Sequence, residues 1–220
     1  MKPDLIIFDC DGVLVDSEPI STSVLCDLFV EYAIPIDQAT VYQRFLGRSM
    51  ASMRSVLNDE YGIAMTDEHL EFVRRNMRAR LTSELKPIPG IAAALGRLEM
   101  PVCVASSSTP ERIRLSLGVT GLTEYLEPNI FSATMVSNGK PAPDLFFHAA
   151  LKMGVDPERC LVIEDSPAGV MAAQAAQMRV FGFTGGGHAV PAGLASALAA
   201  LGPDLIFSDM RSLPDMLARA

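Results

Sequence analysis

Short apolar runs alternate with helix-like segments along most of the chain. The runs lie at residues 5–8, 101–106, 129–133, 160–165, 179–183 and 204–209. Apolar positions at helical spacing predict helices between several of them, at residues 91–98, 111–117 and 144–153. Short, fully apolar strands separated by helices are typical of a parallel sheet that is covered on both faces. The pattern therefore predicts an α/β fold with a doubly wound, Rossmann-like core.

One segment interrupts this alternation. Residues 17–84 contain no convincing strand, and their apolar residues recur at helical spacing. A connection between a strand and its helix is usually about two to six residues long. We therefore interpret residues 17–84 as a helical cap domain inserted after the first strand, with residues 1–16 and 85–220 forming the core. The proline-rich stretch KPIPG marks the return of the chain to that core.

Polar residues stand where three of the apolar runs end. Asp9 and Asp11 follow the first run, Ser106 ends the second, and Glu164 and Asp165 end the fourth. In open parallel sheets, ligands bind beyond the carboxyl ends of the strands. We therefore expect these five side chains to converge on one crevice beneath the cap.

The four carboxylates in this set predict a cation. Side chains alternate along a strand, so Asp9 and Asp11 point to the same side if the extended geometry persists. Converging carboxylates repel one another unless they are protonated or hold a cation. An all-oxygen ligand set with room for water and phosphate suits Mg²⁺. A lone aspartate after a strand would more simply cap a helix, but two acidic clusters favour a Mg²⁺ site formed by Asp9, Asp11, Glu164 and Asp165.

A lysine and a run of serines predict a phosphate site at the same crevice. Lys140 lies in the loop NGKPAPD before a predicted helix, where its ammonium group would supply a counter-charge to the carboxylates. The Ser106 hydroxyl can donate a hydrogen bond to a phosphoryl oxygen. Ser107 and Ser108 either do the same or cap the helix that begins near Pro110.

Composition and charge argue against several other classes of protein. Hydrophobic residues make up 49% of the chain and charged residues 20%, as in ordinary globular domains. No apolar run reaches the ~18 residues of a membrane-spanning helix, and a net charge of −8 argues against nucleic-acid binding. The four cysteines and three histidines show no metal-ligand spacing. The N-terminus lacks a signal-peptide pattern, so we expect a cytoplasmic protein.

The motif TGGGH at residues 184–188 follows a predicted strand. No Lys-Ser or Lys-Thr pair follows it, so it is not a nucleotide P-loop. Its glycines either let the loop approach the crevice closely or simply allow a turn.

Four segments, taken in order, carry a resemblance to a known family. They are DCDGVLVDSE, VASSS, NGKPAPD and VIEDSPAGV. Together they resemble the four motifs of the haloacid dehalogenase superfamily, in the subgroup whose helical cap follows the first strand. The most similar members are the β-phosphoglucomutase-like sugar-phosphate phosphatases, which include 6-phosphogluconate phosphatases. The resemblance extends over most of the chain.

The resemblance implies a phosphoric monoester hydrolase and a role for each motif residue. Asp9 would be the nucleophile that forms an aspartyl-phosphate. Asp11 would protonate the leaving alkoxide and then deprotonate the attacking water. Ser106 and Lys140 would bind the phosphoryl group. The implied Mg²⁺ ligands are Asp9, the backbone carbonyl of Asp11, Glu164 and Asp165.

The cap would select the leaving group. Gly47 and Arg48 resemble a cap loop that, in this family, dips toward the active site. Arg48 would bind a carboxylate or a second phosphate, or is simply a surface residue. We expect a small phosphorylated metabolite as substrate, either a sugar phosphate or a sugar-acid phosphate. No oligomerisation motif is legible, so the oligomeric state stays open and a monomer is compatible with the sequence.

The sequence disfavours four functions other than phosphate hydrolysis. The related mutases carry a histidine in the cap hinge, where this chain has SEPISTS and Ser21, so hydrolysis is favoured over phosphotransfer. Dehalogenases of the superfamily lack the second aspartate, so the presence of Asp11 disfavours that reaction. A receiver-like signalling domain would lack the helical insertion. A pseudoenzyme would not be expected to keep every motif residue.

Overall fold

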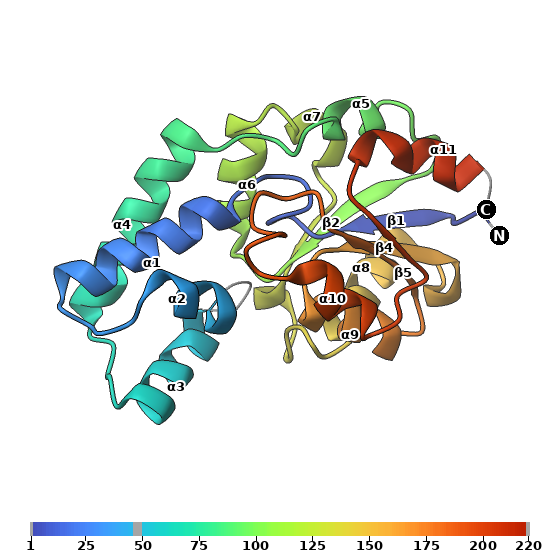
Figure 1. Ribbon diagram of the computed structural model, residues 1–220. Helices are drawn as coiled ribbons and strands as arrows, with labels where there is room; N and C mark the ends of the chain where they lie inside the picture. Colours follow the sequence, from blue (N-terminus) through green and yellow to red (C-terminus); the bar gives the residue numbers. More distant parts are fainter. Residues whose placement is uncertain (1, 46–49, 219–220) are drawn as a thin grey trace.

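Six parallel strands form the centre of the molecule (Figure 1). The structure is a computed structural model that describes residues 2–45 and 50–218. The strand order is β3-β2-β1-β4-β5-β6, and each hydrogen-bonded pair is parallel. The strands are β1 (Leu5–Phe8), β2 (Val102–Ser106), β3 (Ile130–Ser132), β4 (Cys160–Glu164), β5 (Arg179–Phe183) and β6 (Leu205–Phe207). All six predicted strands are present, and the predicted fold class is confirmed.

Helices connect these strands and also fill the segment between β1 and β2. They are α1 (Glu18–Glu31), α2 (Gln38–Arg44), α3 (Met50–Tyr61), α4 (Asp67–Glu84), α5 (Ile91–Leu95), α6 (Pro110–Val119), α7 (Thr123–Leu126), α8 (Asp144–Met153), α9 (Pro167–Ala175), α10 (Leu194–Ala199) and α11 (Leu213–Ala218). Three short 3₁₀ helices are η1 (Ala133–Met135), η2 (Pro157–Arg159) and η3 (Met210–Ser212). The helix predicted at 91–98 ends early, because Gly96 follows Leu95 and glycine is a poor helix former.

Alternate residues of β1 face two different apolar layers. Ile6 and Phe8 belong to a cluster that includes residues of α5, α6 and α11. Leu5 and Ile7 belong to a second cluster with residues of α8 and α9. All four side chains are fully buried. A central strand of a sheet covered on both faces has no polar face, which explains the unbroken apolar run in the sequence.

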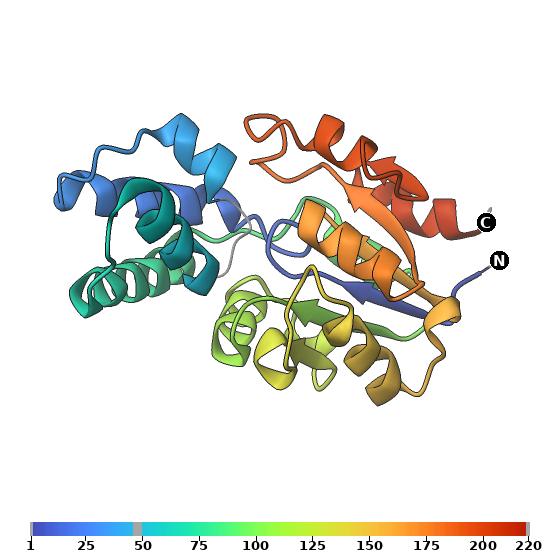
Figure 2. The ribbon, with the colours of Figure 1, turned by 90° about the horizontal axis from the view of Figure 1, so that it is seen from below.

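The helices α1–α4 lie beyond the carboxyl ends of the strands. Figures 1 and 2 both show them at one end of the sheet, with α1 packed along α4. No strand occurs in residues 18–45 or 50–84, so the helical insertion after the first strand is present. The division of the chain at residues 16/17 and 84/85 stays a prediction.

The chain turns immediately after β1. Gly12 has a left-handed φ of +79°, and the Leu14 amide donates a hydrogen bond to the Cys10 carbonyl over 2.9 Å. Glycine adopts this backbone conformation without the strain that a Cβ would cause. The strand itself ends at Phe8 and the backbone bends at Cys10, so the extended geometry that would place Asp9 and Asp11 on the same side does not persist to Asp11. Strand alternation therefore does not set the direction of the Asp11 carboxylate.

Candidate active site

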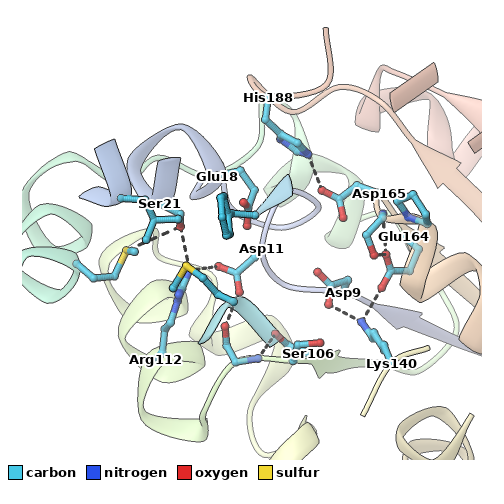
Figure 3. Close-up of a pocket in the computed structure, with 18 of the residues that line it drawn as sticks. Asp9, Asp11, Glu18, Ser21, Ser106, Arg112, Lys140, Glu164, Asp165 and His188 are labelled. Atoms are coloured by element: carbon cyan, nitrogen blue, oxygen red, sulfur yellow. Dashed lines mark hydrogen bonds and ion pairs between the residues drawn. The ribbon is translucent and has the colours of Figure 1, made fainter. Parts of the chain in front are cut away.

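A cavity of about 420 Å³ lies between the carboxyl ends of the strands and the inserted helices. It is the space where ligands bind in open parallel sheets. Figure 3 shows how its charged residues face one another. Its described lining residues from the core are Asp9, Asp11, Ser106, Ser107, Ser108, Thr109, Arg112, Lys140, Glu164, Asp165, Ser166, Pro167, His188 and Leu194. Those from the inserted helices are Glu18, Ser21, Leu25, Phe45, Met53, Val73 and Met77.

Lys140 links the first acidic residue to the second acidic cluster. Its Nζ lies 2.6 Å from Asp9 Oδ1 and 2.6 Å from Glu164 Oε1, and it donates to the Ala105 carbonyl over 2.9 Å (Figure 3). The Lys140 side chain is only 4% exposed. These three contacts exclude a role as a solvated surface lysine. Glu164 is fixed from its other side, because Ser166 donates to Oε2 from both its amide and its hydroxyl.

Burial and mutual repulsion act on the carboxylates around Lys140. Burial is the largest influence on Asp9 and raises its pKa well above the usual value; Lys140 opposes this rise and Glu164 adds to it. Burial, followed by the charge of Glu164, likewise raises the pKa of Asp165. Burial lowers the pKa of Lys140, but the charges of Asp9 and Glu164 outweigh it and the net shift is upward. The single ammonium group of Lys140 does not balance the charges of the neighbouring carboxylates. A bound cation would offset the remaining negative charge.

Asp11 lies in a different environment from Asp9. Arg112 donates to its Oδ1 over 3.0 Å, Ser17 donates to Oδ1 over 2.6 Å, and Ser108 donates to Oδ2 over 2.6 Å. Burial alone would raise the pKa of Asp11, but the Arg112 charge and the serine hydrogen bonds lower it below the usual value. The two carboxylates line one cavity, yet Asp9 faces Lys140 while Asp11 faces Arg112 (Figure 3).

The serine run after β2 divides into three distinct positions. Ser106 is 1% exposed and its hydroxyl accepts a hydrogen bond from the Ser108 amide. Ser107 is exposed and lines the cavity. Thr109 is the N-cap of α6, and its hydroxyl accepts a hydrogen bond from the Arg112 amide. The alternative that Ser107 or Ser108 caps this helix is therefore wrong, because the N-cap position lies one residue after Ser108 and two after Ser107.

Three titratable residues of the cavity wall were not predicted from the sequence. Arg112 lies in the first turn of α6, Glu18 begins α1, and His188 ends the TGGGH motif. Burial, and then the charge of Asp11, raises the pKa of Glu18 to about 7. His188 is 2% exposed, and burial lowers its pKa despite the nearby charges of Glu18 and Asp16. Glu18 begins its helix and Arg112 is the third residue of α6, so a position near a helix N-terminus at the crevice was their available signal. His188 lies five residues beyond the end of β5, and the TGGGH motif was its local signal.

The structure describes the predicted metal ligands but not the two predicted cap residues. Asp9, Asp11, Glu164 and Asp165 all line the cavity. Within residues 2–45 and 50–218, no group of three or more acidic, histidine or cysteine side chains is gathered closely enough to hold a metal ion by itself. Gly47 and Arg48 lie outside the described residues, so their predicted contact with the leaving group stays a prediction.

The fold and the order of the site residues define a family. The chain belongs to the haloacid dehalogenase-like hydrolases, whose profile matches residues 3–177. The chain is similar to 6-phosphogluconate phosphatase of Escherichia coli (strain K12), at 35% identity over 189 residues and 86% of each chain. Membership of this family confirms the predicted resemblance and the prediction of a hydrolase.

Two solved structures resemble the chain over nearly its whole length. A haloacid dehalogenase-like protein from Agrobacterium tumefaciens str. C58 is 39% identical, with a TM-score of 0.86 and 98% of each chain covered. A haloacid dehalogenase family hydrolase from Deinococcus radiodurans R1, solved with bound phosphate and sodium, is 33% identical. Its TM-score is 0.81, with 99% of this chain and 96% of that chain covered. In the part of the chain that the structure describes, no helix has the length and apolar character needed to span a membrane.

Proposed function

We propose that this chain is a Mg²⁺-dependent phosphatase that hydrolyses a small phosphorylated metabolite through an aspartyl-phosphate formed on Asp9. The observation that carries the proposal is the Lys140 ammonium group 2.6 Å from the Asp9 carboxylate, in a cavity that also holds Asp11. A carboxylate can attack an anionic phosphoryl group when nearby positive charge offsets the repulsion. The phosphatase relative and the phosphate bound in the Deinococcus radiodurans structure support this reading.

Asp9 and Asp11 divide the two proposed steps. In the first, an Asp9 oxygen bonds to phosphorus, the bond from phosphorus to the leaving oxygen breaks, and protonated Asp11 gives its proton to that oxygen. In the second, Asp11 takes a proton from a water molecule whose oxygen bonds to phosphorus. The bond to Asp9 then breaks and inorganic phosphate leaves.

The contacts of Asp11 suit the second step more directly than the first. Arg112, Ser17 and Ser108 together favour its carboxylate form, which is the form that deprotonates water. To act as an acid, Asp11 must exchange at least one of these donors for the leaving oxygen of the substrate. Binding of the substrate in the cavity supplies that exchange.

Three residues would bind the transferring phosphoryl group. Lys140 supplies the positive charge, and Ser106 and Ser107 supply hydroxyl donors at the end of β2. Charge-assisted and hydroxyl hydrogen bonds to the equatorial oxygens stabilise the charge that develops during phosphoryl transfer. All three line the same cavity as Asp9.

The residues at the cavity fit a Mg²⁺ ion. The proposed ligands are carboxylate oxygens of Asp9 and Asp165 and the backbone carbonyl of Asp11, with Glu164 acting through water. Mg²⁺ keeps several waters and is usually bound by one or two carboxylates together with substrate phosphate. Two direct carboxylates therefore suffice, although three side chains do not form a ready-made cage. When bound, the ion would supply positive charge to the phosphoryl oxygens.

The proposed substrates are sugar phosphates and sugar-acid phosphates. The 6-phosphogluconate phosphatase relative supports this class. The direct test is phosphate release from a panel of phosphorylated metabolites, with and without Mg²⁺, beside an Asp9→Asn control. Mg²⁺-dependent release that the variant lacks supports the proposal. Isomerisation of β-glucose 1-phosphate with a bisphosphate primer, without phosphate release, would instead favour the mutase.

A further inference from the structure

The glycine-rich loop after β5 is fixed against the turn that follows β1. The Gly187 amide donates to Asp16 Oδ1 over 2.9 Å, and the Thr184 amide donates to the Phe207 carbonyl over 2.8 Å. The loop therefore approaches the crevice closely, which is one of the two roles predicted for the TGGGH motif. The contact brings its last residue, His188, to the cavity wall.

His188 is buried beside a proposed Mg²⁺ ligand. Its Nε2 lies 2.9 Å from Asp165 Oδ2 (Figure 3), and both side chains are less than a tenth exposed. At this distance an Nε2–H group can donate to the carboxylate oxygen of Asp165. Nδ1 is buried and has no hydrogen-bond partner among the described residues. The imidazole therefore contacts Asp165 through Nε2, whereas Nδ1 makes no hydrogen bond to a described residue.

Two glycines leave room for the His188–Asp165 pair. A Cβ at Gly12 would lie 1.8 Å from Asp165 Oδ2 and 2.8 Å from His188 Cε1. A Cβ at Gly186 would lie 2.8 Å from His188 Cε1 and 2.9 Å from Nδ1. Such distances are shorter than real contacts allow, so both backbones rest directly on the imidazole or the carboxylate. The backbone of two separate loops therefore lies against the His188–Asp165 contact.

We infer that His188 is a positioning residue for the proposed Mg²⁺ site: it holds one oxygen of Asp165 and leaves the other for the cation. The inference rests on the proposed function only for the identity of the cation. Carboxylates that bind metals are commonly held by such hydrogen-bonded neighbours, and loss of the neighbour costs about 10- to 100-fold in metal affinity or activity. Mg²⁺ prefers oxygen to nitrogen ligands, so His188 acts on Asp165 rather than on the ion.

The test is Mg²⁺ binding to the metal-free protein, measured by isothermal titration calorimetry, which needs no substrate. His188→Leu removes the Nε2–H donor and puts an apolar side chain in place of the imidazole. It should weaken Mg²⁺ binding at least about tenfold. His188→Gln can place an amide N–H where Nε2 was and should bind Mg²⁺ within about threefold of the unchanged protein. His188→Asn is too short to reach Asp165 and should resemble the leucine variant.

Controls separate positioning from general stability. Thermal unfolding without Mg²⁺ shows whether each variant is folded; if His188→Leu is not, the glutamine and asparagine variants decide. His148→Leu, at a half-buried histidine that packs on the Phe131 ring and does not line the cavity, should leave Mg²⁺ affinity unchanged. A purely structural role for His188 would change stability without separating glutamine from asparagine in Mg²⁺ affinity.

The outcomes distinguish this inference from the proposed function. A folded leucine or asparagine variant that binds Mg²⁺ within about twofold of the unchanged protein overturns the inference, whatever the phosphatase assay shows. Absence of Mg²⁺ binding by the unchanged protein also overturns it. Binding that depends on His188 in a protein that releases no phosphate from any substrate supports the inference and removes the proposed function.

Discussion

The two walls of the cavity differ in chemistry and in how tightly they are held. The core wall carries buried carboxylates and Lys140, joined by hydrogen bonds from strand ends and adjoining loops. The wall formed by the described parts of the inserted helices is mainly apolar, with Leu25, Phe45, Met53, Val73 and Met77; Glu18 and Ser21 are its polar residues. We propose that the core specifies the reaction, whereas the helices shape the space for the leaving group.

The largest expected effect tests whether residues of the core wall carry out the reaction. Asp9→Asn keeps the size of the side chain but removes the nucleophile, so kcat should fall at least about 10⁴-fold. Steady-state phosphate release measures the loss, and thermal unfolding checks the fold. Turnover within tenfold of the unchanged protein would exclude Asp9 as the nucleophile. It would also contradict the assignment of the reaction to the core wall.

The next effect separates the two aspartates of the core wall. Asp11→Asn should lower kcat for an alkyl phosphate by about 10²- to 10⁴-fold, because both proton transfers are lost. With p-nitrophenyl phosphate the leaving group needs no proton. The first step should then survive and the second should not, giving a burst of p-nitrophenol close to one per enzyme followed by slow release. Equal loss of both phases by rapid-mixing kinetics would contradict the assigned role.

A smaller effect concerns Glu18, the acidic residue at the junction of the two walls. Its pKa is raised to about 7 from a usual value of 4.5, so the folded protein holds a proton that the unfolded chain has released. The free energy of unfolding of the metal-free protein should therefore fall as pH rises from about 4.5 to 7, by up to about 3 kcal/mol, and then level off. Urea unfolding across this range measures the slope.

Glu18→Gln should flatten that slope, whereas Glu31→Gln, at an exposed residue of the same helix, should leave it unchanged. An unchanged slope in the Glu18 variant would assign the pH dependence to the core carboxylates Asp9 and Asp165.

The smallest effect tests whether the apolar wall contacts the leaving group. Met77→Gln preserves size but replaces an apolar surface by a polar one, a change of about 1 kcal/mol. We expect the KM for a sugar phosphate to change about fivefold with little change in kcat. Arg78→Gln, at the exposed neighbouring position of α4, serves as the control. A change in kcat alone would contradict the separation of the two walls.

The fold was readable from the sequence because burial leaves a local signal. A central parallel strand is apolar on both faces, so Leu5–Phe8 appears as an unbroken apolar run followed by Asp9, and Cys160–Glu164 as one that ends in Glu164. The convergence of those ends follows from topology alone. The helical insertion was readable by its length and periodicity.

The partners of each site residue were not readable in the same way. The backbone bends at Cys10, between Asp9, which contacts Lys140, and Asp11, which contacts Arg112, and strand alternation contains no information on that bend. Arg112 and His188 reach the cavity by three-dimensional packing of segments about 100 and 180 residues from the first strand. Such contacts depend on distances between elements, which local patterns do not fix.

The stereochemistry at phosphorus tests most directly whether the phosphoryl group is transferred to Asp9 before it is transferred to water. Hydrolysis of an isotopically chiral phosphorothioate ester in labelled water would be followed by analysis of the product configuration. Each in-line displacement inverts the configuration, so two displacements through an aspartyl-phosphate predict overall retention. Net inversion would mean that water attacks the substrate directly, and it would contradict Asp9 as the nucleophile.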